Sequence, residues 1–166
     1  MGPVFRLALS GRGLFFAAMT KRFLRYWLPV ILWMALVFAA STGLGRSENT
    51  GRFFRPILIW LFPRISEETL DRIHYTVRKV SHFGEYAVLG LLVWRWLYYE
   101  PLAAGCRPRI YATALLISAL YASSDEFHQE FVPGREAAVR DVAIDTCGSG
   151  FGLAALWTCR RVGRRG

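Results

Sequence analysis

The stretch SSDEFHQEFVPGRE, residues 123–136, places groups capable of acid–base chemistry or ligand binding directly after the apolar run YATALLISALYA. The groups of interest are Asp125, Glu126, His128, Gln129 and Arg135. Carboxylates and imidazoles bind divalent cations and transfer protons, whereas a guanidinium group binds phosphate or carboxylate. So many ionisable residues beside an apolar run indicate a polar site at the edge of a nonpolar environment.

Two other short stretches carry the same residue types. His82 and Glu85 are three residues apart, and Asp141 and Asp145 are four apart, as are Asp125 and Gln129. Residues three or four apart share one face of a helix. The spacing therefore predicts that helix ends bring these pairs to a common depth.

The composition of the chain indicates the kind of protein that must position these groups. Of its 166 residues, 54% are hydrophobic and 20% are charged, and 21 basic residues outnumber 12 acidic ones for a net charge of +9. The basic residues lie between apolar runs rather than on one polar face, which argues against a nucleic-acid-binding protein. This distribution is typical of a membrane protein whose loops contact anionic headgroups.

Four apolar segments are close to the length that a spanning helix needs. They cover residues 27–44, 83–99, 110–124 and 142–159, and the third reaches spanning length only if its helix continues into the sequence SDEFH. The sequence therefore predicts an all-α integral membrane protein with four transmembrane helices. Trp94, Trp96, Tyr98 and Tyr99 predict an aromatic belt at one end of the second helix.

An additional helical segment is expected between the first and second spans. Residues 53–63 are apolar but contain Pro56 and Pro63, so we expect them to lie at the membrane interface. Leu70, Ile73 and Val77 recur at helical spacing in the stretch that follows, which predicts an amphipathic helix.

The three parts of the chain are a basic N-terminal tail, residues 1–26, a membrane domain, residues 27–160, and a basic C-terminal tail, residues 161–166. Residues 1–18 are expected to be disordered or not native, because Met19 is an alternative start. Four spans place both tails on one side, and the charges near the helix ends favour the cytoplasm. We do not expect Cys147 and Cys159 to bridge each other, because twelve residues of helix separate them by about 18 Å.

Three motifs together resemble the VanZ-like family of bacterial membrane proteins. These motifs are KVSHFGEYAVLGLL, DEFHQEFVPGR and RDVAIDTCGSGFG. The matching positions are His82, Glu85, Tyr86, Asp125, Glu126, Gln129, Arg135, Asp141, Asp145 and Gly148. The resemblance implies a protein of the bacterial cytoplasmic membrane that lowers susceptibility to glycopeptide antibiotics of the teicoplanin type or handles the cell envelope. Many members have Asn where this chain has Asp145.

Three interpretations of the polar residues stay open at this point. They could form a structural network in which Arg135, with Lys79 or Arg140, neutralises the carboxylates. They could instead form a catalytic site, either as a metal-free acid and base or with a divalent metal ion, acting on a lipid-linked or peptidoglycan-related substrate. The candidate metal ligands are His82, Glu85, Asp125, His128, Asp141 and Asp145. As a third possibility, they could line a pocket that binds or carries a cell-envelope precursor or a glycopeptide-related ligand.

Overall fold

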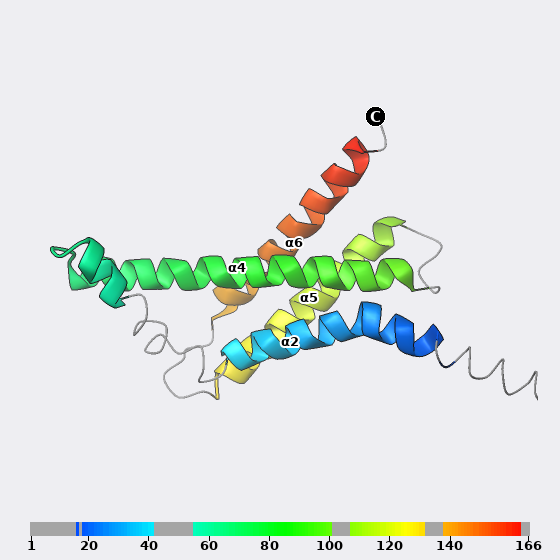
Figure 1. The fold of residues 1–166 in the computed structure, drawn as a ribbon, viewed down its shortest axis with the longest axis horizontal. Coiled ribbons are helices and arrows are strands. Elements are labelled where there is room, and N and C mark those ends of the chain that lie inside the picture. The colour runs from blue at the N-terminus through cyan, green and yellow to red at the C-terminus, as the bar shows by residue number, and fades with distance from the viewer. Residues whose placement is uncertain (1–15, 17, 42–54, 101–106, 132–137, 164–166) are drawn as a thin grey trace, which may run out of the picture.

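The computed structural model describes residue 16 and residues 18–41, 55–100, 107–131 and 138–163, and the elements within these ranges are helical. A π-helical turn, η1 (Phe23–Trp27), leads into α2 (Leu28–Ser41). Three longer helices follow: α4 (Glu67–Tyr99), α5 (Arg107–Gln129) and α6 (Val139–Val162). Residues 55–61 form a further short helix. The prediction of an all-helical fold is confirmed (Figure 1).

The π turn leads into the first predicted span, within one helix that runs from Ala18 to Ser41. Pro29 has no N–H group, and its ring clashes with the carbonyl four residues earlier, so a regular α-helix cannot run through it unchanged. The helix turn just before this proline is wider than an α-helical turn, because the N–H of Leu28 donates to the carbonyl of Phe23, five residues earlier. A π turn at this point accommodates the proline and lets the helix continue. Residues 42–44 of the predicted span lie outside the described residues.

Helix α4 corrects one sequence-based expectation. The amphipathic stretch and the second predicted span are not separate helices, because one helix runs from Glu67 to Tyr99. It begins at Ser66, whose hydroxyl accepts a hydrogen bond from the N–H of Thr69 at 3.3 Å. No proline interrupts the helix, so nothing breaks its backbone hydrogen bonds at the junction. His82 and Glu85 therefore lie in the middle of a helix, not at its start.

The four main helices alternate in direction, and their contacts fix which ends meet. Trp27 at the start of α2 packs on Trp96 near the end of α4, with ring centroids 4.3 Å apart. Arg160 near the end of α6 lies over the ring of Trp94 at 4.7 Å. The start of α2 and the end of α6 therefore both lie beside the C-terminal end of α4. The aromatic residues predicted for one end of the second span do gather there, although Trp94 is 6% exposed and belongs to the core.

Helices α4 and α6 cross each other obliquely, with their C-terminal ends toward the same end of the bundle (Figure 1), and approach closely at glycines. A Cβ atom at Gly148 would lie 2.3 Å from the carbonyl oxygen of Phe83, and one at Gly152 would lie 2.6 Å from that of Ala87. The backbones can be this close only because glycine has no side chain. The predicted role of these glycines in close helix approach is confirmed.

The surface of the bundle is apolar. Exposed large hydrophobic side chains include Leu32, Leu36, Leu116, Leu120 and Phe151. The helices Ala18–Ser41, near the N-terminus, and Val139–Val162 are long and apolar enough to cross a membrane. Cys147 and Cys159 are free thiols, as expected, and Cys106 lies outside the described residues.

Candidate functional site

Asp125 is at the centre of a buried polar contact between α2 and α5. Its Oδ2 atom accepts hydrogen bonds from the hydroxyl of Ser41 at 2.6 Å and from the amide of Gln129 at 3.1 Å. All three residues are at most 2% exposed. Asp125 and Gln129 are one helical turn apart and share a face of α5, as the sequence spacing predicted. Ser41 is the last residue of α2, so this contact joins the end of one helix to the end of another.

Two further contacts join the start of α6 to its neighbours. Lys79 of α4 forms an ion pair with Asp141, and both side chains are largely buried. Glu126 of α5 accepts a hydrogen bond from the N–H of Ala138 at 2.6 Å. Ala138 precedes the first turn of α6, so Glu126 satisfies one of the N–H groups that a helix start leaves without a partner. Lys79 and Glu126 thus hold α6 from two different helices.

Asp145 and His82 face each other across the close contact between α4 and α6. Nδ1 of His82 lies 3.8 Å from Oδ1 of Asp145, which is longer than a hydrogen bond and short enough for an ion pair if the imidazole is protonated. Asp145 is 3% exposed, and Oδ1 accepts no hydrogen bond within the described part of the chain. The hydroxyl of Tyr86, also buried, makes none there either. The cluster therefore has unused hydrogen-bonding capacity.

The acidic side chains of the site are close enough for their charges to interact. Asp145 experiences the charges of Asp125, Asp141, Glu126 and Glu85. Glu85 in turn experiences the charge of Asp125. Like charges gathered in a buried region repel each other unless protons or cations compensate them. We call this group the polar cluster; its members are Ser41, Lys79, His82, Glu85, Tyr86, Asp125, Glu126, Gln129, Asp141 and Asp145.

Two of the sequence-predicted residues are not placed in the polar cluster. His128 packs its ring against Phe38 of α2, with centroids 4.5 Å apart. His128 is three residues after Asp125 on α5, so it lies to one side of the helix face that Asp125 and Gln129 share. Arg135 lies outside the described residues. Lys79, rather than Arg140, pairs with a cluster carboxylate among the residues that the structure describes.

The positions of the candidate ligands decide whether they could bind a metal ion together. Within the described ranges, no three His, Cys, Asp or Glu side chains are arranged so that they could hold a metal ion. The candidate ligands His82, Glu85, Asp125, Asp141 and Asp145 share a region without converging on a point.

Sequence reasoning missed Ser41 as a member of the site. It ends the apolar run WLPVILWMALVFAAS, which predicts a spanning segment and not a polar site. A hydroxyl at the end of an apolar helix was the only available signal, and serine at such a position commonly bonds its own helix backbone. Its partner, Asp125, is 84 residues away in the chain.

The Lys79–Asp141 pair should stabilise the protein more than an exposed ion pair on the same helix. Its side chains are 18% and 17% exposed, whereas those of Arg72 and Glu68 are 78% and 76% exposed. In double-mutant cycles to Ala, we expect a coupling energy of about 1–3 kcal/mol for the first pair and about 0.3–0.5 kcal/mol for the second. The measurement is the unfolding free energy of each variant in detergent micelles. Equal coupling energies would contradict the structural role of the pair.

Comparison with known families extends over nearly the whole described structure. A family model described as VanZ/LLP1 matches residues 26–160. The matched range includes α2, α4 and α5, most of α6, and every member of the polar cluster. Neither the curated proteins nor the solved structures gave a match.

Proposed function

Because the chain belongs to the VanZ/LLP1 family, we propose that it is a protein of the bacterial cytoplasmic membrane that lowers susceptibility to teicoplanin-type glycopeptide antibiotics. It does so by acting on the cell envelope, and the polar cluster is the part of the molecule that acts. The ligand belongs to the class of cell-envelope precursors or of glycopeptide-related compounds.

The observation that carries this proposal is the burial of so many acidic groups in a small apolar protein. Asp125, Glu126 and Asp145 are each at most 7% exposed. Ionisable groups within a membrane are costly to keep, and they usually mark a functional site. Apolar packing and close glycine contacts also hold the bundle together, and the carboxylates of Glu85 and Asp145 face the cluster beyond the contacts that join the helices.

We place four helices across the membrane. The helix Ala18–Ser41, which includes α2, and helix α6 each have the length and composition of a membrane span. Helices α4 and α5 both pack against α2 and α6. Arg95 weakens the apolar character of α4, but its guanidinium lies 5.4 Å from the ring centroid of Tyr26 at the aromatic end of the bundle. An arginine at that depth can extend to the headgroups. The exposed Leu and Phe side chains of the bundle then face hydrocarbon.

The distribution of charge favours an orientation with both termini in the cytoplasm. Arg22, Arg25, Arg160 and Arg161 lie at the end of the bundle where α2 begins and α6 ends. Basic residues near helix ends remain on the cytoplasmic side. The polar cluster lies at the C-terminal ends of α2 and α5, which are at the opposite end of the bundle from these arginines. In this orientation the cluster is near the outer surface, where envelope precursors and glycopeptides are found.

Asp125→Asn tests the function without removing the hydrogen-bond acceptor. We expect the variant, produced in a teicoplanin-susceptible bacterium, to lose the protection that the wild-type chain confers, because the site loses a negative charge. Its midpoint of thermal unfolding should change little, since an amide oxygen can still accept from Ser41. The measurements are the minimum inhibitory concentration and a thermal scan of the purified protein.

Three outcomes of this experiment are distinct. Lost protection at unchanged stability supports a functional cluster. Lost protection with a large loss of stability supports a purely structural network. A wild-type chain that confers no protection, although it reaches the membrane, would refute the proposed role in resistance.

A further inference from the structure

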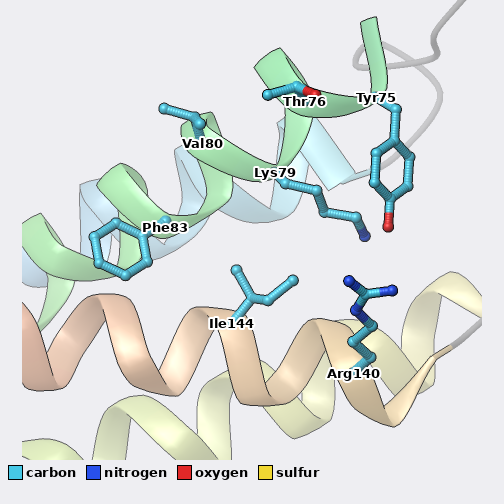
Figure 2. Close-up of a pocket in the computed structure, with 7 residues that line it drawn as sticks. All are labelled: Tyr75, Thr76, Lys79, Val80, Phe83, Arg140 and Ile144. Carbon is cyan, nitrogen blue, oxygen red and sulfur yellow. The ribbon is translucent and has the colours of Figure 1, made fainter. Parts of the chain in front are cut away.

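A groove of about 330 Å³ lies between α4 and α6, on the surface of the bundle. Of the polar cluster, only Lys79 lines it, and the ion pair of Lys79 with Asp141 connects the groove to the cluster. Figure 2 shows α4 along one side and α6 along the other, with side chains from both pointing into the space between them.

One end of the groove is polar and positively charged. The hydroxyl of Tyr75, Nζ of Lys79 and the guanidinium of Arg140 point toward one another (Figure 2). Lys79 is paired with Asp141, whereas Arg140 makes no ion pair with any residue that the structure describes. Nζ of Lys79 also lies 5.1 Å from the centroid of the Tyr75 ring. Within the described part of the chain, this end therefore has a positive charge without a paired carboxylate and several hydrogen-bond donors.

The rest of the groove is apolar. Phe83 and Ile144 lie between the two helices away from the charged end (Figure 2), and Val80 also lines the groove. The centroid of the Phe83 ring lies 5.6 Å from that of Phe151. Phe151 is 63% exposed and lies nearly two turns after Ile144 on α6. An apolar path thus continues from the groove along α6, in the direction of the predicted membrane interior.

We propose that this groove binds one molecule of a lipid with an anionic phosphate headgroup. The phosphate oxygens accept hydrogen bonds from Arg140, Lys79 and Tyr75, and a hydrocarbon chain lies along Phe83, Ile144 and Phe151. Charge complementarity at one end and an apolar wall at the other match an amphiphile with both parts. Free phosphate would leave the apolar wall in water. The inference rests on the membrane placement proposed above and assigns no role in antibiotic resistance.

Native mass spectrometry of the full chain in detergent tests the proposal. The probes are dioleoyl phosphatidic acid and dioleoyl phosphatidylcholine, whose chains are the same and whose net charges differ. We expect the wild-type protein to bind phosphatidic acid more tightly, and Arg140→Gln to weaken that binding about fivefold, the effect of one basic residue on an anionic lipid. Arg72→Gln is the matched control, because Arg72 is an exposed arginine of α4 outside the groove; its affinity should equal that of wild type.

Val80→Gln examines the apolar wall at a position that is 65% exposed, where the change should not prevent folding. We expect it to weaken phosphatidic acid binding as well. Equal binding of the two lipids, or unchanged binding by Arg140→Gln, would overturn the proposal. Displacement of the lipid by inorganic phosphate at the same concentration would assign the site to free phosphate and would also overturn it. Because these outcomes are measured on purified protein, they are independent of the susceptibility test.

Discussion

Asp125→Ala is expected to lower the free energy of unfolding by about 2–5 kcal/mol, because it leaves two buried polar partners without their acceptor. The hydroxyl of Ser41 and the amide of Gln129 both donate to the Asp125 carboxylate, in a region from which water is excluded. Each abandoned group costs about 1–3 kcal/mol. The remaining contact between Gln129 and Ser41, at 3.3 Å, offsets only part of this cost.

The measurement for Asp125→Ala is unfolding of the purified protein in mixed micelles of increasing dodecyl sulfate content, followed by tryptophan fluorescence. Ser123→Ala is the control on the same helix, because the Ser123 hydroxyl is exposed and donates to the carbonyl of Ala119, one turn earlier in its own helix. We expect that control to stay within about 0.5 kcal/mol of wild type. Similar losses in both variants would show that Asp125 does not join α2 to α5.

Gly148→Ala is the second substitution for which we expect a large effect, a loss of about 1–3 kcal/mol of unfolding free energy. The new methyl group would lie 2.3 Å from the carbonyl oxygen of Phe83, so α4 and α6 must move apart. A backbone carbonyl cannot rotate away as a side chain can. The same movement would pull His82 away from Asp145, so the variant should weaken the function in parallel with the stability.

Gly150→Ala is the matched control for this experiment. Its Cβ atom would meet only Cδ1 of Leu115, at an ordinary contact distance of 3.9 Å. Alanine favours the helix over glycine by up to about 1 kcal/mol, so this variant should be as stable as wild type or more stable. Two glycines separated by one residue should therefore respond in opposite directions to the same substitution. A loss of stability in both would mean that glycine has another role in α6.

The positions of the helices followed well from the sequence, because apolar runs of sufficient length have few other structures available. Residues 110–124 were expected to continue helically into the polar sequence after them, and α5 does extend to Gln129. The expected break before the second span was wrong. The change from an amphipathic to an apolar pattern at residue 83 marks a change of surroundings, whereas a helix ends only where its backbone hydrogen bonds are interrupted.

Within the site, residues that share a helix face could be predicted and partners on different helices could not. The spacing of Asp125 and Gln129 indicated a common face, and the structure places both in one contact. The rotation of α5 about its own axis decides that His128 meets Phe38 instead of the carboxylates. That rotation depends on the packing of all its neighbours. Lys79 was one of the cations expected to neutralise the carboxylates, but the sequence did not indicate that Lys79 would pair with Asp141, 62 residues away.

The continuity of α4 has a mechanical consequence. A helix of 33 residues is about 50 Å long, whereas the hydrocarbon layer is about 30 Å thick. In the membrane placement proposed above, roughly four turns of α4 therefore project from the layer as a stiff rod, and Figure 1 shows α4 extending well past the end of α2. Since no hinge separates the projecting turns from His82 and Glu85, a torque applied outside the bilayer would rotate both side chains together.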